Sequence, residues 1–304
     1  MATDRPAGFS IAGQLEHAEA GGRSATAWQP YLDFTRDVQN KLLCSGTEAG
    51  WKERQCQWLF VYKDLPSESW SWASSAIQQL SLWGIVQGKD PSQYLFDPAA
   101  PVTRAEFAKM VMLLRAKRES VCVDAVPKAK EIFESGTASC TVDGLTDVDG
   151  HWACGYIKEA HAQSIIHGFS GEADATGAAP FKPDDPIKRR QLTKLITAGL
   201  DLCPDDQELT ENYSTEIAQF SDPGLAAFCA DPDDSEHWYC KPLVCASLKN
   251  VIRGRDRSGG YFFDGQETAT RAEAVLALYR AFDASTLDSS EGPCASGLEE
   301  NHHD

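Results

Sequence analysis

WASSAIQQLSLWGIVQG, residues 72–88, starts with a tryptophan and ends with a glycine sixteen positions later. The same spacing recurs in WACGYIKEAHAQSIIHG (152–168) and in WYCKPLVCASLKNVIRG (238–254). Apolar residues of the first copy follow the i, i+4 spacing of one helical face, and Gly84 suits the left-handed position that ends a helix. Each copy therefore predicts a short helix and a turn. The three leading tryptophans are expected in the core, because each begins an apolar stripe.

A second spacing, between an aromatic residue and an arginine, follows each of these blocks. The two residues are eight positions apart in every copy: Phe96 and Arg104, Phe181 and Arg189, Phe263 and Arg271. The gap between the two blocks varies from eight to thirteen to nine residues. Two blocks of fixed spacing joined by a variable loop indicate a repeated helix–loop–helix unit.

The second helix of each unit has a recognisable start. Thr103 with Glu106, and Thr270 with Glu273, are threonine–glutamate capping boxes, in which hydroxyl and carboxylate each pair with a backbone N–H at the helix start. The middle copy, at 188–191, reads Lys-Arg-Arg-Gln and lacks a good N-cap residue. We expect that helix start to be weaker by about 1 kcal/mol.

The two spacings divide the chain into repeats and connecting segments. The repeats are placed at 60–117, 143–201 and 218–283, with an N-terminal extension at 1–59, linkers at 118–142 and 202–217, and an acidic tail at 284–304. An aspartate precedes each first helix in a turn-rich loop, and we expect it to cap or brace the start of that helix: Asp64, Asp147 and Asp222.

Charge and hydropathy exclude several classes of protein. The chain has 304 residues and a net charge of −17, so its surface repels nucleic acid and anionic lipid. No apolar run is long enough for a membrane-spanning helix, and no signal peptide is visible at the N-terminus. No nucleophile elbow, phosphate loop, dinucleotide fingerprint or zinc-hydrolase motif is present, and we expect no enzyme activity and no cofactor.

The ten cysteines are even in number and show no metal-binding spacing. Disulfides in an oxidising compartment are therefore expected, with buried free thiols as the alternative. Sequence proximity favours the pairs Cys44–Cys56 and Cys122–Cys140, and the other pairings stay open. No metal site is expected.

An aspartate loop, a tryptophan-led helix, a glycine turn, Phe-x-Pro and Thr-Arg-Ala-Glu together resemble the S-layer homology domain. Phe96-Asp97-Pro98 and Phe181-Lys182-Pro183 follow the aromatic–proline step, and Phe263-Asp264-Gly265 departs from it by one residue. The resemblance covers about 190 residues in three copies. It implies a mainly α fold, in which three tandem helix–loop–helix repeats form a pseudo-threefold, three-pronged bundle, with short irregular N-terminal and linker segments.

The resemblance also implies a ligand and the residues that bind it. In that family, grooves between repeats hold cell-envelope polysaccharide, often pyruvylated, and the arginine of Thr-Arg-Ala-Glu helps to bind the anionic group. The implied glycan-binding residues are Arg104, Arg189 and Arg271, with the cap residues Thr103, Glu106, Thr270 and Glu273 and the glycines Gly88, Gly168 and Gly254. A guanidinium near a helix N-terminus suits a carboxylate. The alternative is that these arginines are solvated or paired with neighbouring acids, and that the glycines serve backbone geometry.

Two functions follow for an extracellular protein at the cell surface or envelope. The first is a non-catalytic anchor, or surface-layer component, that binds the polysaccharide. The second is a structural subunit that uses the same scaffold to bind other surface or assembly proteins. The two differ in a testable way, because a glycan-binding module keeps basic, open grooves and an interaction subunit buries them against a partner.

Overall fold

The computed structural model describes residues 43–45, 55–57, 62–65, 68–90, 95–119, 125–232 and 236–287. The chain divides into two compact units, 1–61 and 62–304. In the first, strands β1 (Leu43–Ser45) and β2 (Gln55–Gln57) pair antiparallel with Cys44 opposite Cys56. The predicted Cys44–Cys56 bond concerns side chains outside the described part of the chain and stays a prediction. The rest of the extension and most of the predicted tail also lie outside it.

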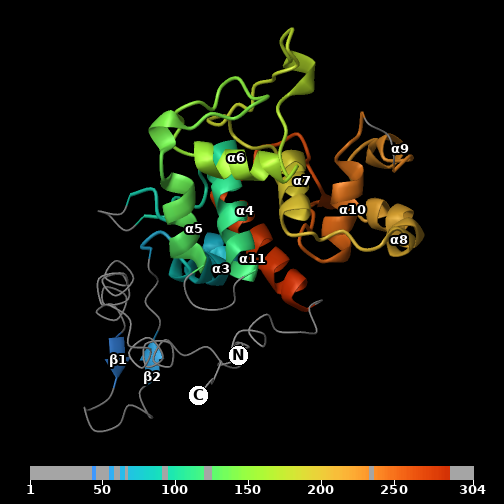
Figure 1. Cartoon of the computed structure of the whole chain (residues 1–304). Coiled ribbons are helices and arrows are strands. Elements are labelled where there is room, and N and C mark those ends of the chain that lie inside the picture. The colour runs from blue at the N-terminus through green and yellow to red at the C-terminus, as the bar shows by residue number, and fades with distance from the viewer. Residues whose placement is uncertain are drawn as a thin grey trace, which may run out of the picture. The chain divides into compact units, whose positions relative to one another are not determined.

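The second unit is mainly helical, as the sequence predicts (Figure 1). The first helices of the three repeats are α3 (Ser71–Leu82), α6 (Cys154–Ala162) and α10 (Cys240–Leu248). The second helices are α4 (Arg104–Glu119), α7 (Arg189–Gly199) and α11 (Arg271–Leu287). Short 3₁₀ turns lie at Glu68–Trp70 (η1), Thr137–Ser139 (η2) and Ser170–Glu172 (η3).

The first helices end in the same way in all three repeats. Gly84, Ser164 and Asn250 follow their last turns with left-handed φ angles of 71°, 57° and 56°. In each case the next residue's amide reaches back across the last turn, as when Ile85 N–H donates to the Leu80 carbonyl at 2.9 Å. This arrangement satisfies carbonyls that the end of a helix leaves unpaired. The predicted left-handed role of Gly84 is confirmed.

The helices pack in a closed cycle between repeats. Helices α4, α7 and α11 contact one another at the centre of the unit. Around them, α3 packs on α11, α6 on α4 and α10 on α7. Each first helix therefore packs against the second helix of the repeat before it, and the first repeat closes the cycle against the third.

A ring of backbone hydrogen bonds closes the same cycle at the starts of the second helices. Val102 N–H donates to Ala269 O at 3.3 Å, Ala269 N–H to Ile187 O at 2.9 Å, and Ile187 N–H to Val102 O at 2.9 Å. All three residues are buried. Because each residue both donates to one neighbour and accepts from the other, the backbone polar groups are satisfied only when all three repeats are assembled.

The three loop aspartates hold the loops that carry the repeated phenylalanines. The two carboxylate oxygens of Asp147 accept from the Phe181 and Lys182 amides, both at 2.7 Å. The other copies do the same: Asp64 with Phe96 and Asp97, and Asp222 with Phe263 and Asp264. These aspartates thus brace the loop before the second helix, and not the start of the first helix as the sequence predicts. In each copy, the residue after the phenylalanine has a left-handed φ of 53–58°.

The predicted linkers contain helices, so their predicted irregular structure is wrong. Helix α5 (Ala125–Glu134) packs on α4 and α6. Helix α8 (Asp206–Ala218) starts at Asp205, whose carboxylate accepts from the Glu208 amide at 2.9 Å, and packs on α10. The short helix α9 (Leu225–Phe228) follows, and the hairpin of β3 (Arg255–Arg257) and β4 (Gly260–Phe262) lies in the third repeat.

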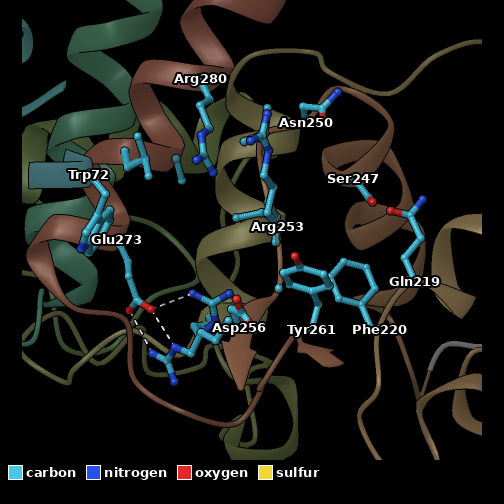
Figure 2. A pocket seen from close by; sticks show the side chains of 17 residues that line it. Trp72, Gln219, Phe220, Ser247, Asn250, Arg253, Asp256, Tyr261, Glu273 and Arg280 are labelled. Atoms are coloured by element: carbon cyan, nitrogen blue, oxygen red, sulfur yellow. Dashed lines mark hydrogen bonds and ion pairs between the residues drawn. The ribbon is translucent and has the colours of Figure 1, made fainter. Parts of the chain in front are cut away.

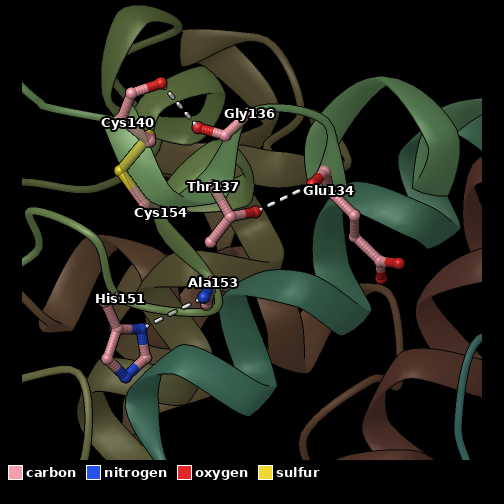
Figure 3. The surroundings of a disulfide bond; sticks show 8 residues. Glu134, Gly136, Thr137, Cys140, His151, Ala153 and Cys154 are labelled. Carbon is pink, nitrogen blue, oxygen red and sulfur yellow. Dashed lines mark hydrogen bonds between the residues drawn. A yellow bond between two sulfur atoms is a disulfide. The ribbon is translucent and has the colours of Figure 1, made fainter.

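The disulfides in the described residues differ from the predicted pairing. Cys140 bonds to Cys154, the first residue of α6, and not to Cys122, which lies outside the described residues (Figure 3). The turn at Gly136 and helix η2 bring Cys140 back over α6, a path that sequence proximity does not indicate. Two more bonds tie the segment containing α8 and α9 to α10: Cys203–Cys245 and Cys229–Cys240.

We predict that Asp147→Ala destabilises the protein by about 2 kcal/mol or more, since two backbone amides lose a charged acceptor. The melting temperature should fall by about 5 °C. The matched control is Asp149→Ala, an exposed aspartate in the same loop. Thermal unfolding followed by circular dichroism measures both, and equal melting temperatures for the two variants would contradict the bracing role.

Candidate functional site

The three repeated arginines join neighbouring repeats. Arg104 Nε donates to Phe181 O at 2.7 Å, Arg189 Nε to Phe263 O at 2.7 Å, and Arg271 Nε to Phe96 O at 3.1 Å. Each arginine therefore reaches the phenylalanine loop of the next repeat, and the third reaches the first. All three arginines are buried.

Each guanidinium also lies over the ring of the phenylalanine whose carbonyl it contacts. The distances from the guanidinium carbon to the ring centroid are 4.4 Å for Arg104, 6.0 Å for Arg189 and 4.6 Å for Arg271. A cation and the face of an aromatic ring attract each other when the cation lies within about 6 Å of the ring centroid. The arginines are therefore part of the contact between repeats, and only their terminal nitrogens remain for another partner.

Two of the arginines lie within ion-pair distance of the capping glutamates, which also pair with Lys89 and Arg255. Arg271 Nη1 lies 3.6 Å from Glu106, and its Nη2 donates to Gln87 O at 2.7 Å. Arg189 Nη1 lies 3.2 Å from Glu273.

The same glutamates complete the two predicted capping boxes, which are confirmed. Thr103 N–H donates to Glu106 at 2.9 Å, and Glu106 N–H donates to the Thr103 hydroxyl at 3.1 Å. The corresponding distances for Thr270 and Glu273 are 3.0 and 3.2 Å.

Arg104 has no such carboxylate, because the equivalent position in the second repeat is Gln191. Within the described part of the chain, neither of its terminal nitrogens has a hydrogen-bond or ion-pair partner. Burial lowers the pKa of Arg104 to about 10, and the more distant charges of Asp185 and Asp147 offset only part of this effect. Arg104 is thus a buried cation, still charged at neutral pH, without a close counter-charge.

No side-chain N-cap hydrogen bond is present at the start of α7, and the lower stability of this helix start stays a prediction. Gln191 Oε1 accepts from the Lys188 amide at 3.0 Å, so one half of a capping box is present. The lysine ammonium has no acceptor with which to complete the other half. Gln191 therefore serves the helix start while adding no negative charge beside Arg104.

The residues that contact Arg104, or share its aromatic neighbour, define what we call the Arg104 site: Arg104, Phe169, Phe181 and Lys182. Besides Phe181, Arg104 lies over the Phe169 ring at 4.7 Å, and Lys182 Nζ lies 4.8 Å from the centroid of the same ring. Cations and aromatic faces therefore alternate here on a chain that is acidic as a whole.

The aligned glycines allow close backbone approach. A Cβ atom added to Gly88 would lie 2.5 Å from Leu95 O, one on Gly168 would lie 2.8 Å from Ala179 O, and one on Gly254 would lie 2.8 Å from Phe262 N. Real side chains are not found at such distances from backbone. The glycines are required where the chain returns towards each phenylalanine. This agrees with the alternative that these glycines serve backbone geometry.

Cavities lie at the two other arginines. A cavity of about 190 Å³ is lined by Arg271, Glu106, Gly88 and Trp152. A larger one of about 890 Å³ is lined by Arg189, Glu273, Gly254 and Trp72, together with other residues of the third repeat (Figure 2). Each cavity thus combines an arginine, a capping glutamate, an aligned glycine and a tryptophan from another repeat.

The prediction that the tryptophans are core residues is wrong for two of the three. Trp72 is 47% exposed and Trp152 is 45% exposed, and Trp238 is intermediate. Trp72 lies at the edge of the buried stripe of α3, which is formed by Ala73, Ala76, Ile77 and Leu80. Trp152 lies before the first residue of α6. The apolar pattern begins one residue later than the tryptophan, which leaves the ring free to line a cavity.

Sequence reasoning missed two basic residues that line the larger cavity, Arg253 and Arg280. Arg253 directly precedes the aligned Gly254, and that adjacency is the signal that could have identified it. The described residues contain no group of three or more His, Cys, Asp or Glu side chains placed to hold a metal ion. Among them there is also no helix long and apolar enough to cross a membrane.

Comparison with known proteins finds one family model that matches two parts of the chain. Residues 61–108 and 144–193 match the S-layer homology domain, and the third repeat has the same ring contacts as these two. The chain is 24% identical over 265 residues to the exoglucanase XynX of Acetivibrio thermocellus, which covers 86% of this chain and 19% of that protein. It is 25% identical over 218 residues to an amylopullulanase of Thermoanaerobacterium thermosulfurigenes, covering 71% of this chain and 9% of that protein.

A third relative is a cellulosome-anchoring protein of Acetivibrio thermocellus. It is 29% identical over 145 residues, which cover 47% of this chain and 27% of that protein. The matches to these three relatives span between 9% and 27% of the relatives' own lengths.

We predict that Glu273→Gln lowers stability at pH 7 by about 1.5–3 kcal/mol, the range for hydrogen bonds to charged groups. Burial alone would raise the pKa of Glu273, but the hydrogen bond from Arg255, the charge of Arg189 and the Thr270 amide outweigh it and lower the net pKa. A carboxyl with a lowered folded-state pKa stabilises the fold above its unfolded pKa of about 4.3, and this contribution is lost as pH falls through the folded value.

The difference between wild type and Glu273→Gln should therefore shrink below about pH 4. Urea unfolding at several pH values between neutral and acid measures this difference. A gap that stays constant down to the lowest pH would show that the Glu273 charge does not stabilise the fold.

Proposed function

Because the chain carries S-layer homology domains, we propose that it is a non-catalytic cell-surface module that binds an anionic cell-envelope polysaccharide between its repeats. It would act outside the cell as an anchor or surface-layer component. The name of the cellulosome-anchoring relative supports the anchoring part of this proposal.

The observation that carries the proposal is the unneutralised cation at the Arg104 site. A guanidinium presents two parallel N–H groups that match a carboxylate, and such pairs are stronger where water is excluded. Arg104 is 5% exposed, and its terminal nitrogens have no partner in the described residues. A carboxylate on a sugar, such as a pyruvyl ketal, would supply the missing counter-charge.

The three arginines are unequal as ligands. Arg189 and Arg271 already have Glu273 and Glu106 within ion-pair distance, so an incoming anion would compete with those carboxylates. Arg104 faces no such competition, because Gln191 is neutral. The proposed order of anion affinity therefore places the Arg104 site first. The tryptophans and lysines beside these arginines would contact the sugar rings.

Alanine substitution is a poor test of this proposal. Arg104→Ala or Arg271→Ala would remove a buried hydrogen bond between repeats as well as any ligand contact. A loss of binding would then be indistinguishable from a loss of fold.

Gln191→Glu separates the two effects. We predict that this variant is at least as stable as wild type, because the new carboxylate neutralises Arg104. Its binding to purified envelope polysaccharide should weaken by about ten-fold, because the same carboxylate occupies the guanidinium. The matched control is Gln207→Glu, which makes the same chemical change on an exposed position of α8.

Sedimentation of each variant with the polysaccharide measures binding, and circular dichroism verifies the fold. Equal binding by Gln191→Glu and wild type would remove Arg104 from the ligand site. If folded wild type binds neither pyruvylated nor unmodified polysaccharide, the glycan-binding proposal is wrong, and a protein partner becomes the function to test.

A further inference from the structure

Two of the three disulfides in the described residues occupy equivalent places in their repeats. Cys154 is the first residue of α6 and Cys240 the first residue of α10, and the two positions align when the repeated tryptophans are aligned. Each is bonded to a cysteine in the segment before its helix, Cys140 in the second repeat and Cys229 in the third. These two bonds therefore belong to the repeated architecture.

The third disulfide, Cys203–Cys245, has no counterpart in the other repeats. The residues aligned with Cys245 are Gln79 in α3 and Glu159 in α6. Its partner Cys203 lies between α7 and α8, so the bond joins the chain just before α8 to α10. Because the same helix forms in two repeats without this bond, the bond serves something particular to α8.

Cys203 is also the most accessible member of these bonds. It is the one exposed residue among the six bonded cysteines of the described residues. Cys140 is intermediate, and the others are at most 2% exposed: Cys154, Cys229, Cys240 and Cys245. Disulfide exchange requires a thiolate to reach a sulfur, so exposed disulfides are the labile ones. A reductant in solution would therefore reach Cys203–Cys245 before the other two bonds.

Helix α8 docks on α10 through a narrow apolar stripe. Its buried residues are Leu209, Tyr213 and Ile217, one in each turn. The Ser247 hydroxyl of α10 also donates to the Glu216 carboxylate of α8 at 2.5 Å. A helix of 13 residues is close to the length below which isolated helices are unstable in water. Because a disulfide excludes many undocked conformations of the segment that it closes, its loss shifts α8 towards undocking.

The docked position of α8 shapes one wall of the cavity of about 890 Å³. Gln219 and Phe220 directly follow α8 and line this cavity, as does Ser247 of α10 (Figure 2). The hydrogen bond from Ser247 to Glu216 therefore connects α8 to the same wall. Undocking of α8 breaks this hydrogen bond and releases Gln219 from the side of α10.

We propose that Cys203–Cys245 is a redox-sensitive clasp, which holds α8 on α10 when oxidised and releases α8 and loosens the cavity wall when reduced. In the reductive step, one thiolate of a small dithiol attacks Cys203 Sγ. The Cys245 sulfur leaves with the electron pair and takes up a proton. The second thiol then displaces Cys203, which gives two protein thiols and one oxidised dithiol. The inference goes beyond the proposed function, because it requires no ligand.

The first part of the test compares the three disulfides within one molecule. The full chain is treated with dithiothreitol, samples are alkylated with iodoacetamide at intervals, and the labelled peptides are identified by mass spectrometry. We expect Cys203 and Cys245 to be alkylated about ten-fold faster than the cysteines of the two equivalent bonds.

The second part measures the docking of α8 by hydrogen–deuterium exchange. In the partly reduced protein and in Cys203→Ala/Cys245→Ala, the amides of α8 should exchange about ten-fold faster than in the oxidised wild type, while those of α4 and α7 stay unchanged. The matched control is Cys140→Ala/Cys154→Ala, which removes one of the two equivalent bonds. Exchange in α8 should then stay within about two-fold of wild type.

Three results would overturn the clasp. They are reduction of Cys203–Cys245 no faster than of the other two bonds, unchanged exchange in α8 after its reduction, and faster exchange throughout α4 and α7, which would indicate general unfolding. Partial reduction of the wild type keeps the test decisive if Cys203→Ala/Cys245→Ala does not fold. Neither readout involves a polysaccharide, so failure of the glycan-binding proposal leaves this inference standing, and the reverse also holds.

Discussion

Closure of the three repeats into a ring is the constraint on which the rest of the structure depends. Helices α6 and α10 have nine residues each, shorter than the length at which isolated helices become stable in water, about 12–15 residues. They are stabilised by packing on α4 and α7, which belong to the preceding repeats. No repeat buries its own apolar face, so removal of one repeat would expose the faces of both others.

The arginines show how a residue that joins the repeats is also available for the ligand binding proposed above. Each Nε atom bonds a carbonyl of the neighbouring repeat, so the guanidinium is fixed in position before any ligand arrives. A fixed donor loses less conformational entropy on binding than a mobile surface arginine. The choice of residue three positions after each cap then decides whether the terminal nitrogens are neutralised or free. Glu106 and Glu273 lie within ion-pair distance of them, and Gln191 carries no charge.

The sequence predicts the helices and capping boxes well because these depend on local spacing. Threonine and glutamate three residues apart, or a glycine after an apolar face, specify a helix end with few distant contacts. Contacts between repeats are not local, and here the predictions were incomplete. Spacing aligned Asp147 with Phe181 in the repeat but did not indicate that the carboxylate holds the Phe181 amide. Nor did it show Cys140 returning to Cys154, or Trp72 projecting from the first repeat into a cavity of the third.

The residues that differ between the three repeats distinguish the candidate sites from one another, whereas the residues common to all three do not. A perfect threefold repeat would give three equivalent sites, each with an arginine neutralised by its glutamate. In this chain, Gln191 leaves Arg104 without a counter-charge, and Arg253 and Arg280 add two cations to the third cavity. Both changes increase local positive charge on a molecule with a net charge of −17, where the long-range field repels anions. Screening limits that field to roughly 8 Å at physiological salt, so an anionic ligand responds mainly to the charges within the site. The symmetric framework holds the side chains in place, and the asymmetric substitutions determine where an anion would bind.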